Sequence, residues 1–131
     1  MEPKKRGFDD LRKIVTILRG DDGCPWDKEQ DENTIKNFLL EETYEIIQAI
    51  ENDDFENLKE ELGDLLFEIL FLAQIASEKG HFDIYDSIEC AYEKFVRRHP
   101  HVFSDDKIFS QNENFFYTFF RCRSDSLIRV V

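Results

Sequence analysis

The sequence predicts an all-α fold, in which short helices form a four-helix-bundle-type core. Only five of the 131 residues are glycine and three are proline, and most of them fall between segments with apolar residues every three or four positions. Little of the chain alternates apolar and polar residues with a period of two, so we expect almost no β-sheet. The length favours a single domain.

The first two predicted helices flank a turn-rich stretch. Residues 8–19 form the first helix, because Leu11, Ile14, Val15 and Leu18 lie on one stripe. The following segment, GDDGCPWD (20–27), reads as a loop because it combines glycine, aspartate and proline. The second helix is predicted over 34–52, with its apolar residues again at helical spacing.

Two further helices complete the predicted bundle. Residues 52–54 break the second helix, and Asp54 can cap the next one. That third helix covers 55–79 and stops at Gly80. The fourth begins near residue 83 and ends before the His-Pro pair at 99–100.

The third helix is apolar around most of its circumference. Its apolar residues are Leu62, Leu65, Leu66, Phe67, Ile69, Leu70, Phe71, Leu72, Ala73 and Ile75. A helix that is apolar all round must be buried all round, and four short helices cannot easily cover it. We therefore expect a homodimer, or a dimer of dimers, that pools helices into one bundle.

Beyond residue 103 the character of the sequence changes. We predict a helical domain over 1–103 and a Phe-rich tail over 104–131, because the tail lacks clean periodicity and holds Phe109, Phe115, Phe116, Phe119 and Phe120. The tail reads either as a docked helix or as an exposed aromatic stretch, which would be prone to aggregation or partner binding.

Charge and hydropathy exclude several partners. The net charge of −12 repels a nucleic-acid backbone, so no nucleic-acid polymer is expected, although a bound metal could still admit a small nucleotide. The N-terminus lacks the apolar core of a signal peptide, and the apolar stretch at 62–76 is too short and too polar to cross a membrane. A cytoplasmic protein is the simplest expectation.

Two pairs of carboxylates are the strongest sign of chemistry. Glu42 and Glu45, like Glu61 and Asp64, are three residues apart, so each pair lies on one face of its helix. Apolar neighbours limit the solvent on these faces, and a hard divalent cation is the simplest compensation for the charge. Two antiparallel helices would bring the pairs together as a metal site.

Two competing interpretations apply to these acids. Such pairs also occur by chance on the solvated face of an acidic helix. A di-iron bundle would use Glu-x-x-His pairs, but neither motif holds a histidine, and oxygen-only ligands favour Mg²⁺ or Mn²⁺. Glu41 points about 100° away from Glu42, and it could be a second-metal ligand or a general base.

The pattern EExxE followed by ExxD resembles the MazG-like all-α nucleoside triphosphate pyrophosphohydrolases. The segments GCPWDKEQ (23–30), LLEETYEIIQAI (39–50), EELGDLLFEILFLAQIA (60–76) and KFVRRHPHVF (94–103) extend the resemblance over residues 8–103. It implies an all-α dimer and Mg²⁺-dependent hydrolysis of (deoxy)nucleoside triphosphates to monophosphate and pyrophosphate. By position, it implies that Glu42, Glu45, Glu61 and Asp64 bind the metal.

The proposed chemistry also needs a proton acceptor and substrate contacts. One of Glu41, Glu42 or Glu45 would accept the proton of the attacking water. The candidates for binding the phosphates are Lys28, Arg97 and Arg98. The alternative is that each is an ordinary solvated surface charge. Trp26 could stack on the nucleobase or cap the core.

The common bacterial relatives carry two such domains and this sequence holds one. A catalytically weak nucleotide- or partner-binding dimer therefore stays a second interpretation.

Overall fold

The computed structural model describes residues 3–103, which contain six helices and no strand. The helices are α1 (Phe8–Leu18), α2 (Pro25–Glu29), α3 (Glu32–Glu51), α4 (Phe55–Glu78), α5 (Ile84–Arg98) and α6 (Pro100–Phe103). This confirms the all-α fold. No helix in this part of the chain is both long and apolar enough to span a membrane. The Phe-rich tail predicted over 104–131 lies outside the described residues.

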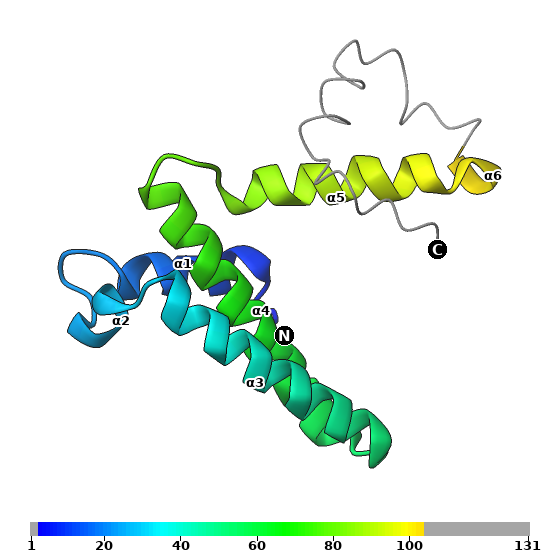
Figure 1. Ribbon diagram of the computed structural model, residues 1–131, viewed down its shortest axis with the longest axis horizontal. Coiled ribbons are helices and arrows are strands. Elements are labelled where there is room, and N and C mark those ends of the chain that lie inside the picture. Colours follow the sequence, from blue (N-terminus) through cyan, green and yellow to red (C-terminus); the bar gives the residue numbers. More distant parts are fainter. Residues whose placement is uncertain (1–2, 104–131) are drawn as a thin grey trace, which may run out of the picture. The chain divides into compact units, whose positions relative to one another are not determined.

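The chain divides into two compact units, Met1–His81 and Phe82–Val131. The first holds α1 to α4. There α3 and α4 lie side by side as an antiparallel hairpin, and α1 packs against α4 (Figure 1). The core of this unit includes Val15 of α1, Ile35 of α3 and Phe71 of α4, each at most 2% exposed.

Local capping signals fix the ends of the hairpin helices. The Asp31 side chain accepts a hydrogen bond from the Thr34 amide, and so α3 begins at Glu32, two residues before the predicted start. Asp54 accepts one from the Asn57 amide, as predicted, and starts α4. Gly80 follows α4 with a φ of 77°, a left-handed conformation that glycine adopts without strain.

The turn between α1 and α3 was predicted as a loop over 20–27, and this was wrong at its end. A short helix, α2, begins at Pro25, because proline at the first helical position has a suitable φ and needs no amide partner. Just before it, the chain folds back closely onto the end of α1. A Cβ on Gly23 would lie 2.2 Å from the Leu18 carbonyl oxygen, so only glycine fits there.

α4 buries one side of its apolar surface and exposes another. Leu70, Phe71 and Ile75 are each 2% exposed. In contrast, Leu62, Leu66 and Ile69 are 50%, 37% and 40% exposed. Residues 3–103 as described therefore leave this face of α4 uncovered, which is consistent with the dimer prediction; the dimer itself stays a prediction.

The second unit contains α5 and the single turn α6. Asp83 caps α5 through the Asp86 amide, and the Asp86 side chain accepts a hydrogen bond from the Asp83 amide in return. α5 ends at Arg98, as predicted. The turn α6 was not predicted; it begins at Pro100, a proline again occupying the first helical position.

Candidate functional site

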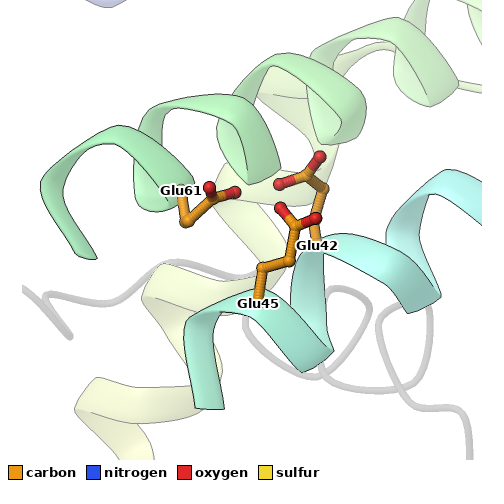
Figure 2. A group of neighbouring side chains, drawn as sticks. All are labelled: Glu42, Glu45 and Glu61. Atoms are coloured by element: carbon orange, nitrogen blue, oxygen red, sulfur yellow. The ribbon is translucent and has the colours of Figure 1, made fainter. Parts of the chain in front are cut away.

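Three carboxylates meet between the two helices of the hairpin. Glu42 and Glu45 come from α3 and Glu61 comes from α4, and one oxygen of each lies within 4.8 Å of the others. Figure 2 shows the two α3 side chains pointing across the hairpin toward Glu61. The meeting follows from the sequence, because a three-residue spacing places Glu42 and Glu45 on one face of α3.

Two buried oxygens of the cluster have no hydrogen-bond donor among the described residues. Glu61 is 9% exposed, and Glu42 is half-buried. Within residues 3–103, Oε2 of Glu42 and Oε2 of Glu61 are both buried without a hydrogen-bond partner. Buried carboxylate oxygens are costly unless a donor or a cation compensates them, so these orphaned atoms fit a cation.

The electrostatics of the cluster agree with its geometry. The pKa of Glu61 is raised, chiefly because the Glu42 carboxylate lies against it, with burial and the charge of Asp64 also contributing. The pKa of Glu45 is raised chiefly by the neighbouring Glu61 carboxylate. Like charges this close disfavour ionisation of all three carboxylates at once, and a bound divalent cation would remove that penalty.

The fourth predicted ligand, Asp64, is placed differently. It lies one turn after Glu61 on α4 and is not among the three clustered carboxylates. Its charge nevertheless raises the pKa of both Glu45 and Glu61, so it borders the cluster. A role for Asp64 as a ligand stays a prediction.

Glu68 of α4 is an acidic residue near the cluster that the sequence analysis did not single out. Its side chain is half-buried, and its pKa is raised by burial first and then by the charges of Asp64 and Asp27. Glu68 therefore extends the acidic face of α4 one turn beyond Asp64, toward α2. The signal was available: Glu68 is seven residues after Glu61 and has apolar neighbours.

The predicted substrate residues of the first unit lie on α2. Trp26 is 58% exposed, and its ring centroid lies 6.3 Å from that of Phe38 on α3. Lys28 is exposed and donates a hydrogen bond to the Asp21 carbonyl oxygen at 3.3 Å. The indole is therefore available to a ligand rather than closing the core.

The other predicted residues are not part of the cluster. Glu41 is exposed on α3, beside Glu42. Arg97 and Arg98 occupy the last turn of α5, in the second unit. Burial and the adjacent Arg98 lower the pKa of Arg97. The roles of Glu41, Arg97 and Arg98 stay predictions.

Oxygen donors alone make up this site. Three clustered carboxylates, with a fourth and a fifth on the next turns of α4, can hold a hard divalent cation such as Mg²⁺ or Mn²⁺. An exposed aromatic ring on the same unit can bind a planar ligand by stacking. The combination suits a ligand with an aromatic group and an anionic group.

Comparisons with known proteins agree with this chemistry. Nucleoside triphosphate pyrophosphohydrolase of Escherichia coli strain K12 is 49% identical over 107 residues, which are 81% of this chain and 41% of that protein. Nucleoside triphosphate pyrophosphohydrolase/pyrophosphatase MazG of Thermotoga maritima is 45% identical over 106 residues, 81% of this chain and 42% of that protein. Bacillus subtilis YabN is 46% identical over 106 residues, 81% of this chain and 22% of that protein.

The chain thus spans about two fifths of the length of the first two relatives (41% and 42%). A family model described as the MazG nucleotide pyrophosphohydrolase domain matches residues 30–103, a range that includes α3, α4 and all three clustered carboxylates. Because this match covers more than half of the 131 residues, the chain belongs to the MazG nucleotide pyrophosphohydrolase domain family.

Proposed function

We propose that this chain hydrolyses (deoxy)nucleoside triphosphates to nucleoside monophosphate and pyrophosphate in a Mg²⁺-dependent reaction. The carboxylate cluster between α3 and α4, with its two unpartnered buried oxygens, is the observation that carries the proposal. The printed names of the E. coli and T. maritima relatives support the reaction class.

In this proposal Glu42, Glu45, Glu61 and Asp64 hold Mg²⁺, for which Mn²⁺ could substitute. When bound, the metal supplies positive charge that neutralises the triphosphate and the developing charge on the leaving pyrophosphate. A carboxylate oxygen of α3, on Glu41, Glu42 or Glu45, accepts the proton of the attacking water. The exposed Glu41 stands next to the cluster and outside it, which suits a base that is not itself a ligand.

The nucleoside and the phosphates need separate contacts. The exposed Trp26 ring stacks on the base, and Lys28 on the same helix contacts the phosphates. Arg97 and Arg98, which lie in the second unit, stay predicted phosphate contacts on the basis of the sequence. A homodimer, or a dimer of dimers, covers the apolar residues that α4 leaves exposed.

The direct test is product analysis. The full chain is incubated with each of the four dNTPs and Mg²⁺, and pyrophosphate and orthophosphate are measured separately. Pyrophosphate release is expected, and orthophosphate release would mean that a different bond is cleaved. Glu42→Gln and Asp64→Asn should abolish turnover while helical circular dichroism is retained, and turnover retained in both variants would refute the site.

The second candidate is a nucleotide- or partner-binding dimer with weak catalysis. It would use the same exposed Trp26 ring and carboxylate cluster to bind a nucleotide without turning it over. Isothermal titration with a dNTP and Mg²⁺ separates the two functions. Tight binding without pyrophosphate release would select the second.

A further inference from the structure

A nearly buried arginine joins the end of α1 to α2 and α4. The Arg19 side chain is 9% exposed. Its Nη1 donates hydrogen bonds to the backbone oxygens of Asp27 and Gln30, at 2.6 and 3.1 Å. Its Nε and Nη2 donate to the two carboxylate oxygens of Glu78, at 2.8 and 2.9 Å. The guanidinium carbon also lies 5.2 Å from the centre of the Phe71 ring.

This arrangement requires an arginine. Two donors face one carboxylate in a planar fork while a third nitrogen position serves two carbonyl oxygens, and a lysine ammonium cannot span both sets. Nε and Nη2 on one edge of the guanidinium bind Glu78, while Nη1 binds the carbonyl oxygens of Asp27 and Gln30 independently. Arg19 is 59 residues from Glu78 along the chain, so it connects elements that are distant in sequence.

α2 depends on such external bonds. It has five residues, none of which is buried, so neither helical propensity nor apolar burial holds it in place. Its entry is fixed by the bond from the Cys24 amide to the Leu18 carbonyl oxygen, at 2.9 Å. Arg19 binds its exit, through the carbonyl oxygens of Asp27 and Gln30; the Asp27 oxygen also accepts a longer bond from the Gln30 amide, at 3.4 Å.

α2 also borders the carboxylate site. Trp26 contacts Phe38 of α3, the helix that carries Glu42 and Glu45. On the other side, the charge of Asp27 acts on Glu68, one turn beyond Asp64 on α4. A shift of α2 would therefore move the exposed indole relative to the three clustered carboxylates.

We propose that Arg19 is a positioning residue for nucleotide binding, because it holds α2 where Trp26 and Lys28 meet a nucleotide whose phosphates lie at the carboxylate cluster. This rests on the proposed function for the identity of the nucleotide. Arg19 itself touches neither the metal nor the substrate.

The sole tryptophan makes the position of α2 directly measurable. In Arg19→Lys, the constant for acrylamide quenching of Trp26 fluorescence should rise, because α2 is released. The KM for dNTP should increase about tenfold, the size expected for losing a hydrogen bond from a charged donor. The kcat should stay within about twofold, and the Mg²⁺-induced melting shift should not change.

Glu78→Gln is the matched control. It removes the ion pair and leaves both bonds from Arg19 to α2, so it should lower the melting temperature while KM and acrylamide quenching stay near those of the unchanged protein. Equal effects of the two variants on KM would overturn the proposal, because Arg19 would then act through general stability. An unchanged KM in Arg19→Lys would overturn it as well.

Gly23→Ala is an independent route to the same result if Arg19→Lys folds poorly. The added Cβ would collide with the Leu18 carbonyl oxygen and displace the entry to α2, so KM and quenching should again rise.

A binding experiment separates this proposal from the proposed function. The binding of a non-hydrolysable α,β-methylene dNTP is measured through the quenching of Trp26 fluorescence. Normal analogue binding without pyrophosphate release would refute hydrolysis alone, whereas equal analogue affinity in the unchanged and Arg19→Lys proteins would refute the positioning role.

Discussion

The ion pair between Arg19 and Glu78 predicts a stability difference that depends on pH. Hydrogen bonds to a charged group contribute about 1.5–3 kcal/mol each at best. The Glu78 side chain is 38% exposed, and solvent screening reduces this contribution. We therefore expect Glu78→Gln to lower the free energy of unfolding at pH 7 by about 1 kcal/mol, or the melting temperature by about 4 °C for a chain of this length.

The sign of the pH dependence follows from the pKa of Glu78. Arg19 lowers this pKa in the folded protein by its hydrogen bonds and its charge, below the ordinary value of 4.5. The stabilisation is therefore fully present above that ordinary pKa, which the unfolded chain keeps, and is lost as the pH falls through the lower pKa of the folded protein. Arg19 stays charged throughout this range, since Glu78 raises its pKa.

Urea unfolding of both proteins at a series of pH values, followed by circular dichroism at a fixed wavelength, measures the difference directly. Taking the difference between the two proteins cancels the contribution of the other acidic groups, including the carboxylate cluster, to the pH dependence of stability. The gap between the two proteins should be constant near neutrality and should close as the pH falls well below 4.5. A gap of the same size at pH 7 and pH 3, or no gap at pH 7, would refute the reasoning.

Four further results are expected. In differential scanning calorimetry, Glu61→Gln should abolish the Mg²⁺-induced melting shift and should raise the melting temperature in EDTA. Glu60→Gln, which changes the exposed neighbouring acid, is the control and should have neither effect. Because the pKa values of Glu45 and Glu61 are raised, protons compete with Mg²⁺, and titration calorimetry should give weaker Mg²⁺ binding at pH 5 than at pH 8. Gly63→Ala should stabilise α4 by about 1 kcal/mol in urea unfolding, since its Cβ would meet nothing within 4 Å in the described chain; a loss of stability would mean that another copy approaches there. Leu62→Lys should give a monomeric mass by light scattering, and an unchanged mass would remove Leu62 from any subunit interface.

The sequence predicted the features that depend on neighbouring residues. The cap at Asp54 and the stop at Gly80 are local, because each acts on backbone groups within one turn. The meeting of Glu42 and Glu45 with Glu61 was also predictable. Helical spacing places Glu42 and Glu45 on one face of α3, and the three-residue connection between α3 and α4 forces the two helices to run antiparallel.

The features that sequence reasoning missed depend on contacts between distant elements. Arg19 lies at the end of an ordinary amphipathic helix, and nothing near it in the sequence indicates a partner 59 residues away. The burial of Glu68 arises from the folded arrangement around α4, and its seven-residue spacing from Glu61 indicated only a shared helix face. The helix α2 was hidden in a segment of turn-forming residues, and the carbonyl oxygens at its exit bind Arg19, which lies outside its five residues.

The two unpartnered oxygens of Glu42 and Glu61 have a consequence for the evolution of this domain. Without a cation, the cluster works against folding, so substitutions that neutralise one of these acids are a ready source of extra stability. Selection for heat tolerance or expression alone would therefore favour variants without the site. Persistence of the cluster in a lineage would record selection for what the site does, and its loss would mark lineages in which that selection has ended.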